Sequence, residues 1–341
     1  MNKKLKTGVF IVNLGTPDSP SVPDVRKYLR EFLMDGRVID IPYINRWLLV
    51  NLIIAPFRSP KSAKIYQELW TDQGSPLKIY GELNEKQLQA ALGDEFVVKL
   101  GMRYQSPSIE KGLLAFRKIG VKKIIVIPLF PQYASASTGS VYEEVTRVLN
   151  TWQSIPELKI VNNFYHKDKF IEGFTENAKK FLSTKKYDHI LFSYHGVPER
   201  QVLKGDDDKD CCQLGNCCNK ITSKNQFCYR AQCFETTRLL AKALDLKEGS
   251  YTLSFQSRLG KSEWIKPYSD KVIKELAQKG VKNILAFSPA FVADCLETTI
   301  EVGDEFSEIF KENGGEHLQL VPSLNDQEVW VELLKELTLE A

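Results

Sequence analysis

GVFIVNLGTP at residues 8–17 and DHILFSYHGVP at residues 188–198 decide the fold, because they are two versions of one pattern. In each, a short apolar run is closed by a glycine and, two residues later, a proline, so Gly15 corresponds to Gly196. Apolar runs that are closed by turn-forming residues are typical of buried strands. Two copies more than half the chain apart predict two similar domains.

A second pair of matching stretches follows in the same order. IGVKKIIVIPLFPQY at residues 119–133 resembles KGVKNILAFSPAFVAD at residues 279–294. Short β-branched runs that alternate with helical periodicity predict parallel strands with helices on both faces of the sheet. The predicted strands are 9–13, 97–101, 124–130, 190–194, 252–255 and 284–288.

The sequence therefore predicts an α/β protein with two similar Rossmann-like domains, each built on a parallel sheet. Residues 1–150 form the predicted first domain and residues 151–324 the second, which carries a cysteine-rich insert at 205–233. A helix at 325–341 is expected to pack on the first domain. Ligands of open parallel sheets bind at the carboxyl ends of the strands, so we expect the active site in the cleft between the domains.

Composition excludes several classes of function. The 46 basic and 43 acidic residues are well mixed, and a net charge of +3 gives no nucleic-acid-binding face. The apolar run near the N-terminus is too short for a signal peptide. The most apolar stretch, residues 47–57, is about half the length that crosses a bilayer. We therefore expect a cytoplasmic protein.

His195 directly follows an apolar strand and is expected at its carboxyl end. A single histidine in such a place is more often structural or merely exposed than functional. The repeat favours function, because the residue that corresponds to His195 in the first half is Leu14. One copy thus carries a base that can accept a proton or bind a metal where the other copy is apolar.

Glu297, Glu301 and Glu305 follow the last predicted strand at intervals of four residues. On a regular α-helix each such step overshoots one turn by about 40°, so the row would spiral. A π-type widening would align it, and such distortions favour functional sites. Aligned carboxylates would have raised pKa values, suited to carrying protons or a hard cation. The alternative is structural, with Asp294 capping the helix and Glu297 as its capping partner.

The stretch PLFPQYASASTGS at residues 128–140 leads from a strand through hydroxyl side chains into a helix. By itself it predicts either an anion site at a helix N-terminus or a well-capped turn. The chain contains no P-loop and no dinucleotide-binding glycine pattern, so nothing indicates a nucleotide.

Six of the seven cysteines lie between residues 211 and 233. In a reducing compartment such a patch indicates metal or cluster ligands rather than disulfides, with free surface thiols as the alternative. Adjacent cysteines do not easily bind one ion together, so we expect four ligands. The candidates are Cys212, Cys217, Cys218, Cys228 and Cys233, of which the isolated Cys228 and Cys233 are preferred.

Together these motifs resemble those of the ferrochelatase family. Matching segments occur along nearly the whole chain, and the histidine of SYHGVP paired with the glutamate of ETTIE is the family's specific signature. The segments are NLGTP at 13–17, RSP at 58–60, GSPL at 74–77, GMRY at 101–104, PLFPQYASASTGS at 128–140, SYHGVP at 193–198, FQSRLG at 255–260 and FVADCLETTIE at 291–301.

The resemblance implies that Fe²⁺ is inserted into protoporphyrin IX to form protohaem with release of two protons, the last step of haem biosynthesis. It implies that His195 binds the iron or accepts pyrrole protons, that Glu297 is its partner across the macrocycle, and that Glu301 and Glu305 continue the acidic row. The implied porphyrin-binding residues are Leu14, Arg58, Ser75, Arg103, Tyr133, Trp264 and Phe291, with the apolar lip 47–57 as a further wall.

The resemblance also bears on the cysteines, because some ferrochelatases carry a [2Fe–2S] cluster held by four of them. Ser135 and Ser137 stand in the loop where the animal form has a cysteine ligand, so this chain looks more like bacterial members with an internal cysteine-rich segment. A structural Cys₄ zinc site remains the alternative.

Two other functions are left open. One is a chelatase for another tetrapyrrole or metal, such as coproporphyrin III or cobalt; the NLGTP start favours protoporphyrin. The other is a non-catalytic haem or metal carrier, which would bind porphyrin without turnover. The apolar lip predicts peripheral contact with the inner face of a membrane, and the oligomeric state is not readable from the sequence.

Overall fold

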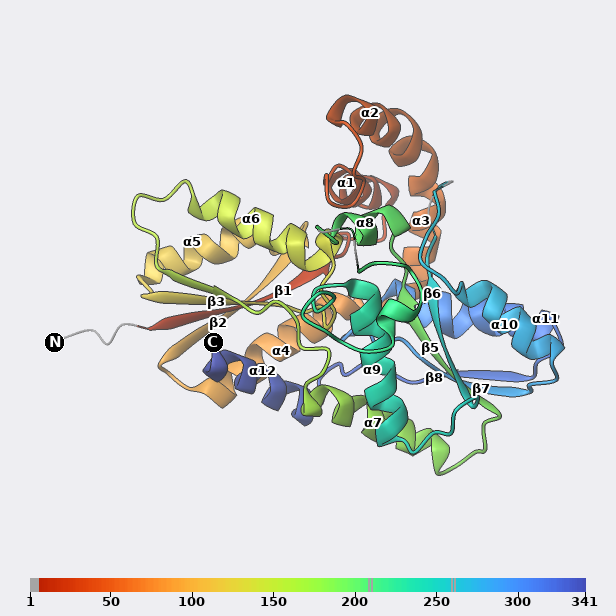
Figure 1. Cartoon of the computed structure of the whole chain (residues 1–341). Coiled ribbons are helices and arrows are strands. Elements are labelled where there is room, and N and C mark those ends of the chain that lie inside the picture. Colours follow the sequence, from red (N-terminus) through yellow and green to blue (C-terminus); the bar gives the residue numbers. More distant parts are fainter. Residues whose placement is uncertain (1–5, 208, 210, 259, 261) are drawn as a thin grey trace. The chain divides into compact units, whose positions relative to one another are not determined.

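The chain forms two compact units (Figure 1). The computed structural model describes residues 6–341 with the exception of residues 208, 210, 259 and 261. The first unit comprises the chain up to Phe130 with Ala134–Asn163 and Val331–Ala341, and the second comprises Pro131–Tyr133 and Phe164–Trp330. The C-terminal segment therefore belongs to the first unit.

The first unit is built on a parallel sheet with the strand order β2-β1-β3-β4. In Figure 1, α5 and α6 cover one face of this sheet and α4 and α12 the other, as crossover connections between parallel strands require. The elements are β1 (Thr7–Gly15), α4 (Pro76–Leu92), β2 (Phe96–Tyr104), α5 (Ile109–Ile119), β3 (Lys123–Pro128), α6 (Ser140–Leu149), β4 (Glu157–Ile160) and α12 (Glu328–Glu340).

Helices between β1 and β2 form a lobe at the top of Figure 1, and Phe32 on its first helix packs against Tyr104 of β2 with ring centroids 5.2 Å apart. It contains α1 (Val22–Leu33), α2 (Tyr43–Leu48), the π-helix η1 (Leu49–Ile54) and α3 (Ala55–Leu69). Large apolar side chains are exposed along it, with Phe57 79% accessible. The exposed residues are Tyr43, Ile44, Trp47, Leu48, Leu52, Ile53 and Phe57, which we call the lip.

The second unit repeats the architecture with the strand order β6-β5-β7-β8, again all parallel. In Figure 1, α10 and α11 lie on one face of the sheet and α7 and α9 on the other. The elements are α7 (Asp168–Leu182), β5 (His189–His195), α8 (Glu199–Lys204), the 3₁₀ turn η3 (Asn216–Cys218), α9 (Tyr229–Ala243), β6 (Tyr251–Gln256), α10 (Ser269–Gln278), β7 (Asn283–Phe287), α11 (Phe306–Glu312) and β8 (His317–Leu320).

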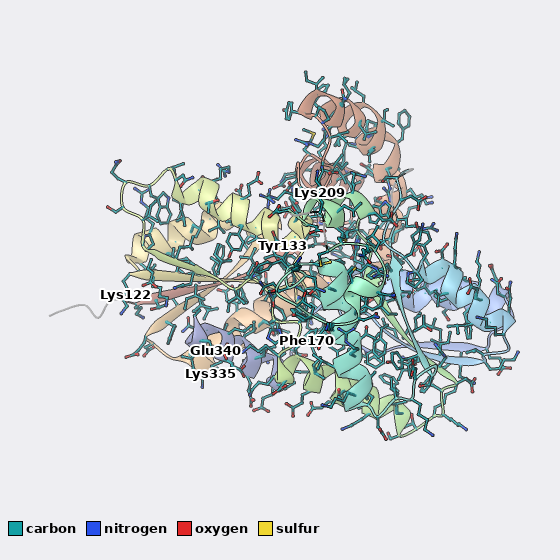
Figure 2. The ribbon with its side chains drawn as sticks, viewed as in Figure 1. Lys122, Tyr133, Phe170, Lys209, Lys335 and Glu340 are labelled. Atoms are coloured by element: carbon teal, nitrogen blue, oxygen red, sulfur yellow. The ribbon has the colours of Figure 1, made fainter. Side chains whose placement is uncertain are left out.

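Buried aromatic and branched side chains fix the helices on the sheets. In the first unit the rings of Phe10 on β1 and Phe116 on α5 meet edge to face at 5.7 Å. In the second, Phe170, labelled in Figure 2, packs against Phe164 and Phe174 and fastens α7. Each such fully buried side chain contributes about 1.5–3 kcal/mol relative to an exposed one.

The structure confirms the two similar α/β domains and all six predicted strands. The sequence analysis missed β4 and β8, which are four-residue strands at equivalent edges of the two sheets. Part of each edge strand faces solvent, so neither shows the continuous apolar run of a buried strand. Among the described residues, no helix combines the length and the hydrophobicity that crossing a bilayer requires.

The repeat has a physical basis in two glycines. Gly120 ends α5 with a φ of 76°, and Gly280 follows α10 with a φ of 88°. Both lie in the left-handed region, where a side chain would be strained, so both copies need glycine at this helix end.

Candidate active site

His195 is the last residue of β5, which runs between β6 and β7 in its sheet. Its ring lies 6.4 Å from that of Trp264 and 6.3 Å from that of Phe291, centroid to centroid. Its Nδ1 is 2.6 Å from the carbonyl oxygen of Gly196. A carbonyl can only accept a hydrogen bond, so Nδ1 carries a proton, and in the neutral ring Nε2 carries the lone pair. The histidine is thus prepared to accept a proton or to bind a metal through Nε2.

The strand registers place His195 opposite Leu14 in the repeat. On β2, Met102 donates its N–H to a proline carbonyl beyond the strand, and on β6 Phe255 does the same. The residues that pair with them in the neighbouring strands are Asn13 on β1 and Tyr194 on β5. The next residues along β1 and β5 are Leu14 and His195, so only one copy carries the base.

The backbone beside His195 is held tightly. The hydroxyl of Tyr229 donates to the His195 carbonyl at 2.7 Å, and the Gly196 N–H donates to the Gln256 carbonyl at 2.8 Å. A Cβ on Gly196 would lie only 2.8 Å from that same Gln256 oxygen, so the close approach of the two strands needs glycine here.

The acidic row lies on a π-helix, η4 (Leu296–Glu305), the helix type that would align carboxylates four residues apart. Gln256 Nε2 donates to the Glu297 carbonyl at 2.8 Å and to Glu301 Oε2 at 3.1 Å. Ser257 Oγ donates to the same Glu301 oxygen at 2.5 Å. One amide at the end of β6 therefore fixes both the helix backbone and one of its carboxylates.

Glu301, like Glu297, is half-buried. Burial raises the pKa of Glu301, and the charge of Glu297 acts in the same direction. The hydrogen bond from Ser257 and the charge of His195 lower the pKa and offset part of this rise. Gln256, the strand partner of His195, thus joins Glu301 and the Glu297 backbone to the end of β5. Glu305, at the end of the row, is exposed.

One extra residue explains the length of η4. The first unit has a shorter π-helix at the same place, η2 (Ser135–Gly139), and the buried Thr138 and Thr298 correspond. The next members of the hydrophobic clusters beside the two sheets are Val141 in the first unit and Val302 in the second, three and four residues further on. An additional residue within a helix widens the turn, which places a carboxylate where the first unit has none.

The structural alternative for Glu297 is wrong. The N-cap of η4 is Cys295, and Thr298 is its partner in the capping box. Asp294 instead accepts hydrogen bonds from the backbone N–H of Ser323 and from the Asn325 side chain. Glu297 accepts a hydrogen bond from the buried Cys295 thiol and takes no part in capping.

Four predicted porphyrin-binding residues belong to the first unit. Leu14 is half-buried, and Arg58 is exposed on α3. Ser75 is buried at the start of α4, where its Oγ accepts a hydrogen bond from Thr16 Oγ1 at 3.0 Å. The contacts of Arg103 are internal to this unit.

Arg103 forms a buried ion pair with Asp35, with Nη2 and Oδ2 2.8 Å apart, and its Nε donates to Ser140 Oγ at 2.6 Å. Burial opposes ionisation of Asp35, but hydrogen bonds from Ser140 and the Arg37 N–H, together with the Arg103 charge, hold the pKa of Asp35 below its usual value. Arg103, which lies on β2, thus connects two other segments. These are Asp35, just after α1, and Ser140, at the start of α6.

Tyr133 belongs to the second unit, although it follows the first sheet in sequence. Its backbone N–H donates to the Gln232 side chain at 2.6 Å, which places it beside the first turn of α9 (Figure 2).

The cysteines of the insert gather before and at the start of α9. Cys228 is the hydrogen-bond donor to the sulfurs of Cys212 and Cys218, which lowers the pKa of Cys212 to about 7 and that of Cys218 to about 6 and raises that of Cys228. Cys217 Sγ lies 3.9 Å from Cys218 Sγ. We call these four residues the cysteine patch. Cys233 is fully buried on α9, and burial raises its pKa.

In the part of the chain that the structure describes, no three His, Cys, Asp or Glu side chains stand in a geometry that would hold a metal ion. The patch does contain a counter-charge, however. Arg230 is 8% exposed, and its Nη1 lies 3.0 Å from Cys218 Sγ. A guanidinium withdrawn from water needs a negative partner, so this contact favours thiolate at Cys218.

Residue-by-residue reasoning missed Gln256, Ser257, Tyr229 and Arg230. The first two lie in the motif FQSRLG, which the sequence analysis quoted without assigning them a role. Their signal was available, because polar residues at the end of a buried strand lie at the same sheet edge as His195. The other two sit beside Cys228, and nothing in their spacing indicated a contact with β5.

The two repeated parallel sheets, with a strand-end histidine beside carboxylates on a π-helix, define a chelatase-type α/β protein. Comparison of folds agrees: SirB from Bacillus subtilis with Fe³⁺ matches with a TM-score of 0.55 at 13% identity, covering 98% of this chain and 95% of that one. A sirohydrochlorin chelatase SirB from Bacillus subtilis subspecies spizizenii, in complex with cobalt, matches with a TM-score of 0.52 at 12% identity, over the same shares of the two chains.

Sequence comparison is more specific. The ferrochelatase family model matches residues 6–341. The ferrochelatase of Coxiella burnetii (strain Dugway 5J108-111) is 46% identical over 326 residues, 96% of this chain and 91% of its own. That of Legionella pneumophila (strain Lens) is 46% identical over 336 residues, 98% and 99% of the two chains. The chain belongs to the ferrochelatase family. It is a lyase that inserts ferrous iron into a porphyrin in haem synthesis.

Proposed function

We propose that this chain metallates protoporphyrin IX, with His195 Nε2 and the Glu297–Glu301 pair as the groups that handle iron and protons. The observation that carries this assignment is the position of Gln256, which pairs with His195 in the sheet and donates to the Glu297 carbonyl and to the Glu301 carboxylate. The rings of Trp264 and Phe291 flank the ring of His195 at the end of β5.

The reaction explains these residue types. Metallation removes two pyrrole protons and presents the ring nitrogens to a dehydrated Fe²⁺. An imidazole lone pair is suited to accept such a proton at neutral pH. A carboxyl with a raised pKa can then hold the proton, and an ionised carboxylate can pass on iron as a hard oxygen ligand. Aromatic side chains bind the apolar face of the macrocycle.

An anaerobic assay with Fe²⁺ and free-base porphyrin tests the substrate. We expect turnover of protoporphyrin IX with kcat/KM at least about tenfold above that for coproporphyrin III, a difference of about 1.4 kcal/mol. Equal or inverted values would assign the enzyme to coproporphyrin. Cobalt should be tested beside iron. Binding of porphyrin without any turnover would indicate a carrier.

We further propose that the cysteine patch holds a [2Fe–2S] cluster, with Cys212, Cys218 and Cys228 as ligands and Cys217 or Cys233 as the fourth. The donor set fits, because it supplies several thiols and a buried arginine that balances negative charge. Such a cluster would supply an iron–sulfur centre that ties separate parts of the insert together.

Metal and sulfide analysis of anaerobically purified protein tests this assignment. A cluster requires about two irons and two acid-labile sulfides per chain. Cys228→Ser should lose both, whereas Cys295→Ser, a buried cysteine on η4, should keep them. One zinc and no sulfide would replace the cluster with a structural zinc site.

The lip supports a third proposal, that this cytoplasmic enzyme touches the inner face of a membrane. Seven large apolar side chains are exposed within 15 residues, and Arg58, Lys61 and Lys64 are exposed directly after them on α3. Apolar residues beside basic ones are typical of helices that lie in a membrane interface. A porphyrin is itself lipophilic, so contact with a bilayer would bring substrate close to the enzyme.

A further inference from the structure

Tyr229 and Arg230 open α9, and their side chains reach two different places. Tyr229 contacts the backbone of the active-site histidine, and Arg230 contacts the cysteine patch. Both side chains are at least nine-tenths buried. Neither contacts the reacting groups directly, and nothing in the reaction described above uses them.

The contact of Tyr229 affects the direction in which the His195 ring points. The ring donates to the carbonyl of the very next residue, Gly196, so its direction follows the local backbone. Tyr229 fixes that backbone by donating to the His195 carbonyl at 2.7 Å. Loss of this hydrogen bond would leave the peptide group between His195 and Gly196 held on one side, by the Gly196 N–H bond to Gln256, and would loosen the direction of Nε2.

Arg230 joins the cysteine patch to the wall beside His195. One end of its guanidinium lies 3.0 Å from Cys218 Sγ and 3.3 Å from the Gly215 carbonyl. The other end donates to the Lys266 carbonyl at 3.4 Å. Lys266 lies two residues after Trp264, whose ring is a neighbour of the His195 ring. A change at the patch therefore has a short physical route to this wall.

We propose that Tyr229 and Arg230 are positioning residues, which hold His195 and Trp264 in place from the first turn of α9 and so couple the cysteine patch to metallation. The Tyr229 contact acts in the metallation reaction whether or not the patch holds a metal. The coupling through Arg230 rests on the proposed metal at the patch.

Tyr229→Phe tests the first contact, because it removes the hydroxyl and keeps the ring. Tyr194→Phe is the matched control: Tyr194 is the fully buried neighbour of His195 on β5, and its hydroxyl bonds Thr237 on the same helix α9. The chain has four histidines, so ¹⁵N-histidine labelling resolves four rings, and the signal lost in His195→Ala identifies His195.

For Tyr229→Phe we expect kcat to fall about three- to tenfold, as for loss of one buried hydrogen bond, with KM for porphyrin within about twofold. The His195 ring signals should move while the other three histidines stay in place. Tyr194→Phe should leave both kcat and the His195 signals unchanged. If both variants behave alike, or if Tyr229→Phe moves all four histidines together, the positioning role is overturned.

Arg230→Gln tests the second contact and does not depend on the first variant folding. Its control is Arg238→Gln, since Arg238 also reaches Cys218, donating to its carbonyl at 2.9 Å, but bonds Glu235 rather than Lys266. Only Arg230→Gln should move the His195 signals and lower kcat about threefold or more. If the wild-type protein holds metal at the patch and the His195 signals do not move in Arg230→Gln, the coupling is overturned.

Metal content separates this inference from the proposed cluster. If the purified protein holds no metal at the patch, the cluster proposal fails, and a shift of the His195 signals in Tyr229→Phe still upholds positioning. If metal is present and neither variant moves His195, the cluster stands and positioning is overturned.

Discussion

At the scale of single residues, the chemistry of this chain depends on what each side chain touches. His195 and His189 occupy opposite ends of the same strand. The Nε2 of His189 meets Thr252 Oγ1 at 2.9 Å, so this histidine is held by a neighbouring strand, and burial lowers its pKa. His195 instead uses Nδ1 in a hydrogen bond to the backbone carbonyl of the next residue, which leaves the Nε2 lone pair available for chemistry.

We expect His195→Ala to fold normally and still bind porphyrin, but to lose metallation at least about 100-fold, because a general base is typically worth that much. Porphyrin binding is followed by absorbance and turnover by the anaerobic assay. His189→Asn is the control and should keep most of the activity. Retention of more than about a tenth of the wild-type rate in His195→Ala would contradict the role assigned here.

Glu301→Gln should change the dependence of stability on pH. Burial raises the pKa of Glu301, so the carboxyl stabilises the fold most when protonated, below its unfolded pKa, and this contribution is lost as the pH rises through the folded pKa. The variant should therefore gain thermal stability relative to wild type as the pH is raised from about 4.5 to neutrality, while metallation collapses. Melting curves measured across this range check the sign; a difference that is independent of pH would contradict it.

At the scale of elements, the π-helix η4 separates the two copies of the repeat. Both units enter a π-helix after the equivalent strand, but only the second extends it over Leu296–Glu305. The extension needs an additional residue, and Gln256 anchors it by binding both its backbone and Glu301. The acidic row is thus a property of helix geometry as well as of residue type.

Deletion of Thr299, which is exposed on η4, should give the second unit the core spacing of the first. We expect the fold to survive, because the first unit packs with that spacing, but Glu297 and Glu301 would then be three residues apart on a narrower helix. Metallation should fall at least tenfold by this misplacement, roughly 1.4 kcal/mol or more. Thr299→Ala keeps the chain length and should be nearly as active as wild type; equal activity in the deletion would show that the widened turn is dispensable.

At the scale of the whole molecule, the two units share one architecture but carry different functional residues. The second unit holds His195, the acidic pair and the cysteine patch, and the first unit carries the lip and the buried Asp35–Arg103 pair. The two copies of the fold have equivalent sheet edges, and only the edge in the second unit carries the reactive groups.

The lip predicts how the whole protein behaves toward lipid. Trp47→Ser together with Phe57→Ser should reduce sedimentation with phosphatidylcholine–phosphatidylglycerol vesicles by about tenfold, because it removes two large side chains that would enter the interface. Leu339→Ser, at an exposed apolar residue on α12, is the control and should sediment like wild type. Equal sedimentation of all three proteins would show that the lip does not bind the membrane.

The sequence by itself determined the duplicated α/β fold and the strand-end place of His195, because both depend on local patterns: β-branched runs, closing glycines and the order of the matching stretches. It also indicated the π-helix, from the four-residue spacing of the glutamates. The edge strands β4 and β8 were missed because partial exposure breaks their apolar runs. Only the tertiary structure decided that Cys295 rather than Asp294 caps η4, that Arg103 is paired with Asp35, and that Gln256 and Tyr229 hold the active-site backbone. The last three contacts join residues far apart in the chain, and the cap itself depends on Asp294 being held by the distant Ser323 and Asn325. Packing of the folded units alone brings these side chains within hydrogen-bonding distance.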